Sequence, residues 1–229
     1  MNRPETRRRT VLALGALPLV SLSLRVLAQG APPREGEDYQ VLQTRIPVEP
    51  EDKIVVLDFF RYGCPHCQAF LAPLQAWEKR LAADVSLQHV PCAFSPDQEA
   101  LSRVYFSLLA LGRLGDLHAK VFDAVIVRRQ RLEDPEDIAA FMATNGIPHD
   151  KWMSVYNSFS MGPSLRHARD MIVAYRIDGT PTLACDGRYL TAPSMMQSAS
   201  SIAEAHDRAL AVLDYLIAKV RAERRQRHK

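Results

Sequence analysis

The stretch FFRYGCPHCQAF, residues 59–70, places Cys64 and Cys67 two residues apart, directly after an apolar run. That run, KIVVLDFF at residues 53–60, is rich in β-branched residues and is typical of a strand buried on both faces of a sheet. After the cysteines, apolar residues recur with the spacing of one helical stripe: Phe70, Leu74, Trp77 and Leu81. The cysteine pair is therefore predicted at the junction between a buried strand and a helix that continues to about residue 81.

The remaining chain supplies the other parts of an α/β fold. Residues 84–90 alternate in polarity and predict a second strand, parallel to the first through a right-handed crossover. Residues 96–175 carry helical spacing throughout, and we expect them to form an inserted helical domain. The sequence LACDGRYL at 183–190 predicts a hairpin with a type I′ turn at its Asp-Gly pair, and residues 202–220 predict a final helix.

The first 28 residues predict a cleavable export signal. A basic start precedes an apolar stretch, and small residues stand at the −3 and −1 positions of a cleavage site after Ala28. A retained N-terminal anchor is the alternative. The pair Arg8-Arg9 suits the twin-arginine route, whereas Val11 matches it weakly, so the general secretory route stays open too. Residues 29–38, rich in Pro, Gly and charge, are expected to form a flexible leader.

The formal net charge of +3 hides an uneven distribution, because basic residues concentrate at the two ends of the chain. Nucleic-acid binding needs a basic patch on a folded face, so we expect no nucleic-acid partner. The basic tail, residues 221–229, is predicted to be a solvated, frayed helix end. A role of this tail at an anionic membrane surface is the alternative.

Three functions compete for the cysteine pair. A purely structural disulfide would close a very small loop and so would restrain the unfolded chain little. A zinc site needs two further ligands, and Cys92 and Cys185 are isolated from each other and from any Cys or His at ligand spacing. The pattern favours a redox centre, since a thiol at a helix N-terminus meets free N–H groups that stabilise its thiolate.

The order of the two cysteines predicts different roles for them. Cys64, at the helix terminus, is expected to be the exposed and acidic nucleophile, with His66 as a nearby donor. Cys67 lies one turn inward and is expected to be shielded, from where it can resolve a mixed disulfide. A stabilised Cys64 thiolate favours the reduced pair and makes the disulfide an oxidant.

The motif CPHC at a strand–helix junction resembles the thioredoxin superfamily, and its Pro65-His66 pair resembles the DsbA branch, bacterial periplasmic dithiol oxidases. The resemblance implies a thioredoxin fold, βαβ then ββα around a mixed sheet, made of residues 39–95 and 176–220, with residues 96–175 inserted. It also implies a redox-active Cys64–Cys67 disulfide, tuned by Pro65 and His66.

The sequence GTPT resembles the cis-proline loop that faces the cysteines in this superfamily and binds substrate, which assigns that role to Thr180 and Pro181. Enteric members of the branch have Val before this proline. The Thr180 of this chain also occurs in related oxidases and in isomerases. The resemblance therefore implies the fold more strictly than it implies the redox strength.

Two further features concern residues near the motif. Asp58 matches a buried acid of the superfamily, and two roles stay open for it: a raised pKa with proton relay to Cys67, or structural hydrogen bonding. In the thioredoxin strand order, the motif's strand separates those carrying Cys92 and Cys185, too far for a disulfide. These two cysteines are expected to be buried free thiols.

The predicted function is that of a periplasmic oxidase that donates the Cys64–Cys67 disulfide to newly exported proteins with free cysteines. Tyr62 is expected to give a tolerant apolar contact for unfolded chains. The resemblance implies reoxidation by a quinone-linked membrane protein of the DsbB type. We expect no cofactor or metal, and we expect the protein to be a monomer. The alternatives are a reductase or isomerase kept reduced, and a peptide-binding chaperone with incidental redox activity.

Overall fold

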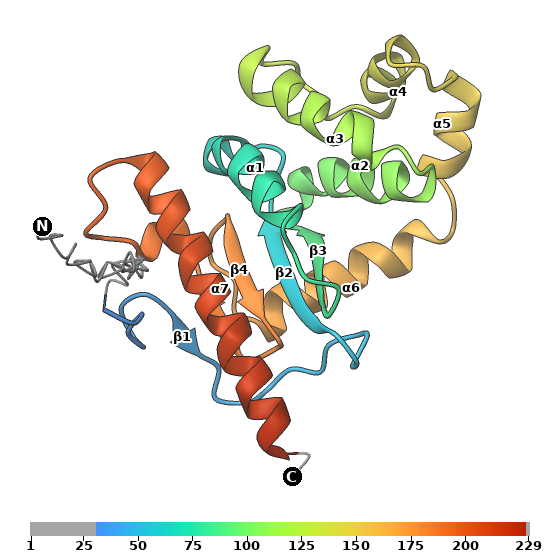
Figure 1. Ribbon diagram of the computed structural model, residues 1–229. Coiled ribbons are helices and arrows are strands. Elements are labelled where there is room, and N and C mark those ends of the chain that lie inside the picture. The colour runs from blue at the N-terminus through green and yellow to red at the C-terminus, as the bar shows by residue number, and fades with distance from the viewer. Residues whose placement is uncertain (1–30, 228–229) are drawn as a thin grey trace, which may run out of the picture. The chain divides into compact units, whose positions relative to one another are not determined.

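A mixed five-stranded sheet lies at the centre of the computed structural model, which describes residues 31–227 (Figure 1). The expected signal peptide falls outside these residues. The strand order is β1-β5-β4-β2-β3, with β2 and β3 parallel and the other pairs antiparallel. The strands are β1 (Gln40–Val41), β2 (Ile54–Phe60), β3 (Val85–Pro91), β4 (Thr182–Cys185) and β5 (Tyr189–Thr191).

Seven α-helices complete the described chain. Six are α1 (Pro65–Glu78), α2 (Glu99–Ala110), α3 (Leu114–Phe122), α4 (Pro135–Thr144), α5 (His149–Tyr156) and α6 (Met161–Ala174), and the last is α7 (Ile202–Arg227). Short turns of 3-10 helix precede α2 and α7, and a π-helical turn, Asp123–Val127, follows α3. No helix within residues 31–227 combines the length and apolar character that crossing a bilayer requires.

Strand β2, which lies between β4 and β3, is buried along its whole length, as its apolar sequence predicts. Alternate residues face opposite sides of the sheet. Ile54 and Val56 pack with α1 and α7 on one face, whereas Val55 and Leu57 pack with α6 on the other. The order βαβ, helices, ββα is the architecture that the thioredoxin resemblance implies.

The helical segment has two roles in the structure. Helices α2 to α5 build their own core, which includes Leu108, Phe122 and Trp152 and continues into the cysteine motif. Helix α6 instead packs Ala168 and neighbouring residues against the sheet. Helical spacing predicts that all of residues 96–175 belong to the insert. The structure shows that α6 also covers one face of the thioredoxin-like sheet.

Local signals fix several element ends. Asp186 and Gly187 both have positive φ, at 53° and 67°, as the predicted type I′ turn between β4 and β5 requires. A Cβ on Gly187 would lie 1.8 Å from the carbonyl oxygen of Ile46, so only glycine fits there. Helix α1 ends at Glu78, a few residues earlier than the apolar spacing predicted.

Both ends of the described chain are more ordered than expected. In the segment expected to be a flexible leader, the backbone N–H of Arg34 donates to the Asp38 carboxylate at 2.8 Å, and the Thr191 hydroxyl donates to the Asp38 carbonyl oxygen. At the other end, α7 continues to Arg227. Arg221 forms a two-point ion pair with Asp84, which ties this helix to the turn before β3 and corrects the expectation of a frayed tail.

Candidate active site

The two cysteines of the motif begin helix α1. Cys64 is the N-cap residue with extended backbone angles, and Pro65 occupies the first helical position, where its missing N–H costs nothing. The backbone N–H groups of His66 and Cys67 both interact with the Cys64 sulfur. The strand–helix junction predicted from the sequence is therefore present, and it directs the free donors of the helix terminus at one thiol.

The surroundings of Cys64 favour its thiolate. The Cys67 thiol donates a hydrogen bond to Cys64, burial opposes ionisation, and the two backbone N–H groups support it. Together they lower the pKa of the Cys64 thiol to about 5. When it is protonated, Cys64 can donate to the Thr180 carbonyl oxygen, 3.2 Å away. The thiolate that the helix terminus predicts is thus the favoured form at neutral pH.

Cys67 has the opposite character. Its hydrogen bond to Cys64 and its burial raise the pKa of the Cys67 thiol well above the usual range. Exposure does not separate the two cysteines, since Cys64 is 5% exposed and Cys67 is 4%. The expectation that Cys64 is exposed was therefore wrong, because Thr180 and neighbouring groups cover its sulfur in this structure. The two thiols, both free here, differ in acidity rather than in accessibility.

The loop before β4 faces the motif. The peptide bond between Thr180 and Pro181 is cis, as expected from the sequence. Beside it lies a cavity of about 330 Å³, lined by His66, Pro181, Ile202 and further residues of the loop and of α7. His66 is exposed on this side of α1, and Ile202 is 63% exposed. The predicted loop and His66, which lies between the two cysteines in the sequence, thus line the same cavity.

Tyr62 does not provide the apolar contact that the sequence suggested. It is 1% exposed, and its hydroxyl lies 2.7 Å from His118 Nδ1. Burial lowers the pKa of His118 to about 3, with the nearby His89 adding to the effect, so the imidazole that shares this hydrogen bond with Tyr62 is neutral. The exposed apolar residue beside the motif is Ile202 instead.

Asp58 lies beneath the cysteines and pairs with a histidine. Its Oδ2 atom accepts a hydrogen bond from His89 Nδ1 at 2.8 Å, across the β2–β3 pair in which the two residues face each other. Burial alone would lower the pKa of His89, but the hydrogen bond and charge of Asp58 raise it. Within the described chain, the second oxygen of Asp58, Oδ1, is buried without a hydrogen-bond partner.

A small internal cavity lies between Asp58 and Cys67. Its volume is about 10 Å³, and its walls include Asp58, Cys67, His118 and Pro181. Neither His89 nor His118 stands at the spacing of a known motif in the sequence. One signal could have found His89, since it stands in the strand predicted to pair with the one that carries Asp58.

The other two cysteines lie apart from the motif. Cys92 follows β3 and Cys185 ends β4, with β2 between these strands. Both are buried free thiols, and burial raises the pKa of each. They fit the expected role of small apolar residues in the core.

Known proteins resemble this chain over most of its length. The family model of the DSBA-like thioredoxin domain matches residues 55–203. A thiol:disulfide interchange protein DsbA from Burkholderia cepacia is 34% identical over 88% of this chain and 94% of its own. The DsbA of Bordetella pertussis is 39% identical over 82% of this chain and 86% of its own.

Solved structures agree with these relatives. The crystal structure of Pseudomonas aeruginosa DsbA superposes with a TM-score of 0.78 at 31% identity, covering 84% of this chain and 96% of that one. The oxidoreductase DsbA from Xylella fastidiosa has a TM-score of 0.73 at 30% identity, covering 83% and 98%. The CPHC motif, the cis-proline loop and these similarities together show that the chain belongs to the DsbA-like thioredoxin-domain family of thiol:disulfide oxidoreductases.

Proposed function

We propose that this oxidoreductase works as a dithiol oxidase, which donates a Cys64–Cys67 disulfide to newly exported proteins. The observation that carries this proposal is the position of Cys64 at the N-terminus of α1, beside Cys67, where the surroundings lower the pKa of the Cys64 thiol to about 5 and raise that of Cys67. A thiolate that is stabilised at neutral pH stabilises the reduced pair. The disulfide is then easily reduced, so it oxidises other thiols.

The reaction takes place in two exchange steps. A substrate thiolate attacks the Cys64 sulfur and breaks the Cys64–Cys67 bond, and the leaving Cys67 takes up a proton because its pKa is high. A second substrate thiolate then attacks the substrate sulfur of the mixed disulfide and releases Cys64 as a thiolate. Two electrons pass to the enzyme. Of the two protons of the substrate dithiol, one stays on Cys67 and one reaches the solvent.

Asp58 and His89 are well placed to supply the proton that Cys67 needs. The cavity between Asp58 and Cys67 has about the size of one water molecule, and the Asp58 oxygen Oδ1 has no other partner among the described residues. His89 holds the other oxygen and fixes the orientation of the carboxylate. We assign Asp58 as a positioning and relay residue, because it reaches Cys67 through this cavity.

The substrate is expected to bind along the cis-proline loop. Backbone groups near Thr180 can pair with an extended peptide, in the manner of an added strand. The neighbouring cavity presents His66 and the exposed Ile202, so it offers apolar area without a shaped specificity pocket. Such a surface suits unfolded chains of varied sequence.

The family and the N-terminal sequence support a proposal for the compartment and the partners. A cleaved signal at residues 1–28 would bring the protein to the periplasm, where dithiols are oxidised. Reoxidation there needs an electron acceptor, for which a quinone-linked membrane protein of the DsbB type is the expected partner. The Thr180 side chain, at the position where enteric members have Val, leaves a reductase or isomerase as the second candidate.

A substrate oxidation assay separates the candidate functions. The oxidised protein is mixed with a reduced, unfolded protein that has two cysteines, and free thiols are counted over time. We expect one substrate disulfide per enzyme molecule, and none with Cys64→Ser. If only the reduced form acts, by rearranging scrambled disulfides, the isomerase function is correct. If the Cys64→Ser, Cys67→Ser double variant aids refolding as well as the natural protein does, chaperone activity is the main function.

A further inference from the structure

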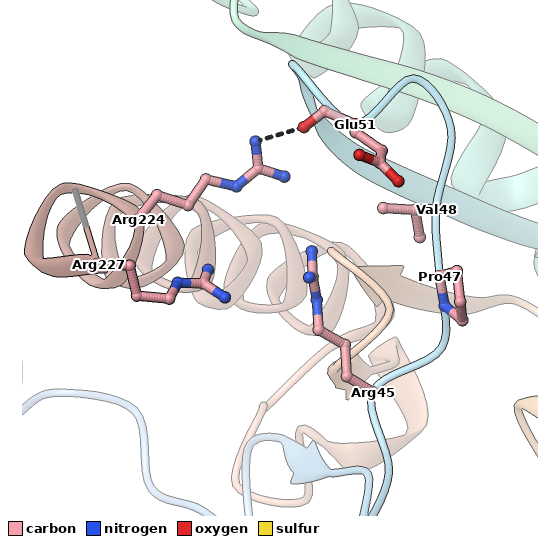
Figure 2. Close-up of a pocket in the computed structure, with 6 residues that line it drawn as sticks. All are labelled: Arg45, Pro47, Val48, Glu51, Arg224 and Arg227. Carbon is pink, nitrogen blue, oxygen red and sulfur yellow. Dashed lines mark hydrogen bonds between the residues drawn. The ribbon is translucent and has the colours of Figure 1, made fainter.

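A second cavity lies at the opposite end of β2 from the cysteines. Its volume is about 520 Å³. It lies between the loop that leads into β2 and the last turns of α7, and Figure 2 shows the residues that line it: Arg45, Pro47, Val48, Glu51, Arg224 and Arg227. Three guanidinium groups thus surround one space, at a site that the thiol chemistry does not use.

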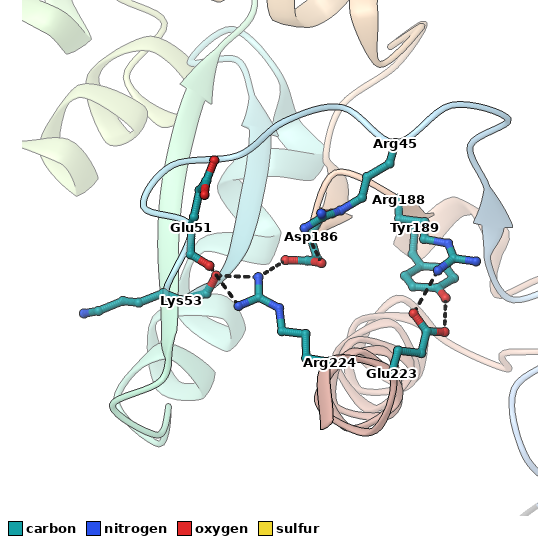
Figure 3. Close-up of polar contacts among 8 residues, drawn as sticks. All are labelled: Arg45, Glu51, Lys53, Asp186, Arg188, Tyr189, Glu223 and Arg224. Carbon is teal, nitrogen blue, oxygen red and sulfur yellow. Dashed lines mark hydrogen bonds and ion pairs between the residues drawn. The ribbon is translucent and has the colours of Figure 1, made fainter. Parts of the chain in front are cut away.

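Two of these arginines are held in place by one buried carboxylate. Asp186 is 3% exposed, and its Oδ2 accepts from Arg45 at 2.8 Å while its Oδ1 pairs with Arg224 (Figure 3). Arg224 also donates to the carbonyl oxygens of Glu51 and Lys53. The two guanidinium groups are therefore oriented before any ligand arrives, which reduces the entropy that binding has to overcome.

The charges around the cavity do not cancel. Asp186 neutralises one of the two guanidinium groups that it holds, and Glu51 opposes a second positive charge. Arg227 adds a third guanidinium, which points toward Arg45 in Figure 2. One positive charge is left over. Three cations that converge on one space repel each other unless an anion lies between them.

The remaining donors suit an oxyanion. Arg45 donates through Nε and Nη2 to Asp186, and its Nη1 has no hydrogen-bond partner among residues 31–227. Guanidinium groups bind phosphate and carboxylate through paired, charge-assisted hydrogen bonds. Pro47 and Val48 form an apolar wall beside these donors. We propose that this cavity binds a phosphate-type oxyanion, carried by a free phosphate compound or by a phospholipid headgroup.

Arg227 offers the cleanest test of the proposal. Arg227 is exposed, so Arg227→Gln should leave the fold intact. Replacing Arg45 or Arg224 would instead remove an ion-pair partner of the buried Asp186. Arg225→Gln is the matched control. Arg225 lies two residues before Arg227 on the same helix, is exposed and does not line the cavity. Both variants remove one positive charge from the end of α7.

The experiment is a titration of the full-length exported protein with inorganic phosphate, followed by NMR shifts of backbone amides. We expect saturable shifts at residues 45–51 and at the end of α7. Arg227→Gln should weaken binding by at least about tenfold, the effect of losing one charge-assisted hydrogen bond, and Arg225→Gln by less than about twofold. The absence of saturable shifts at the cavity, or an equal loss in both variants, would overturn the proposal.

Vesicles distinguish the two sources of the phosphate group. The protein is sedimented with vesicles of phosphatidylglycerol or of phosphatidylcholine alone. Binding to the anionic vesicles that falls with Arg227→Gln, but not with Arg225→Gln, identifies a lipid headgroup. Saturable binding of free phosphate without sedimentation identifies a soluble phosphate compound. Both results support the site, and sedimentation that both variants reduce equally counts against it.

Discussion

Two buried aspartates at opposite ends of the sheet meet very different partners. Asp186, in the β4–β5 turn, is 3% exposed and gives one carboxylate oxygen to Arg45 and the other to Arg224. Asp58, on β2 beneath the cysteines, is 4% exposed and pairs with His89 through one oxygen only. Its other oxygen is buried without a partner within residues 31–227.

The difference separates a structural carboxylate from a chemical one. A buried carboxylate whose two oxygens both pair with guanidinium groups has its charge compensated, and here it joins the loop before β2, the hairpin and α7. A buried carboxylate with one free oxygen is costly to maintain, and its unused capacity faces the cavity that also contacts Cys67. Incomplete pairing near the thiols therefore points to function.

The largest expected effect is on stability at the fully paired carboxylate. Asp186→Ala leaves Arg45 and Arg224 without their buried partner, so we expect the free energy of unfolding to fall by about 4 kcal/mol. Urea denaturation of this variant measures the loss, with Asp207→Ala, on the exposed side of α7, as control. A change below about 1 kcal/mol would show that the Asp186 cluster is not structural.

The next effect concerns the two redox forms and their pH dependence. The pKa of Cys64 is near 9 in the unfolded chain and about 5 in the folded, reduced protein. This difference stabilises the reduced protein fully at pH values above 9, and the stabilisation is lost as the pH falls through 5. At pH 7 it is worth about 3 kcal/mol. The disulfide restrains the unfolded chain and so stabilises the oxidised protein by about 2 kcal/mol, which opposes the thiolate contribution to the reduced protein.

We therefore expect the reduced form to unfold at the higher temperature at pH 7. Near pH 4 the order should reverse, because the thiolate contribution is gone and the loop restraint remains. Calorimetry of both forms at the two pH values provides the comparison. An oxidised form that is more stable at pH 7 would contradict the assignment of a stabilised thiolate, and would favour the reductase or isomerase.

A smaller effect is expected at the half-paired carboxylate. Asp58→Asn keeps an oxygen for His89 but cannot carry a proton to Cys67, so formation of the mixed disulfide, in which Cys67 leaves and takes up that proton, should slow about tenfold. Stability should change by less than about 1 kcal/mol, unlike that of Asp186→Ala. Quenched single-turnover kinetics with a two-cysteine substrate measures the step. An unchanged rate would leave Asp58 with the structural role alone.

The smallest effect is expected at His66. Iodoacetamide labelling of reduced Cys64 against pH should show a midpoint near 5. His66→Ala should raise this midpoint only slightly, because the backbone N–H of residue 66, which contacts the sulfur, is retained. A rise of more than about two units would mean that the imidazole, rather than the helix terminus, stabilises the thiolate.

Most of the fold could be predicted from the sequence because its signals are local. The apolar run at 53–60, the Asp-Gly turn and the helical spacing each depend on neighbouring residues, and the structure contains all three elements. The two-residue strand β1 was missed, since its length leaves no detectable alternation. The dual role of α6 was missed too, because helical spacing does not say which surface a helix covers.

The site could be predicted only in part. Cys64, Cys67 and the cis-proline loop follow from short motifs, whereas the partner of Asp58 depends on which strand lies beside β2 and in what register. The burial of Tyr62 depends on His118, which is 56 residues away in the chain. Contacts of this kind arise from tertiary packing, which local sequence patterns do not reveal.

The equilibrium of the Cys64–Cys67 pair against a glutathione buffer tests the central claim most directly. The claim is that the helix terminus and Cys67 hold Cys64 as a thiolate and thereby make the disulfide an oxidant. The account predicts a midpoint well above about −180 mV, the value of protein disulfide isomerase, with no change in Asp186→Asn. A midpoint near −270 mV, the value of thioredoxin, would contradict it.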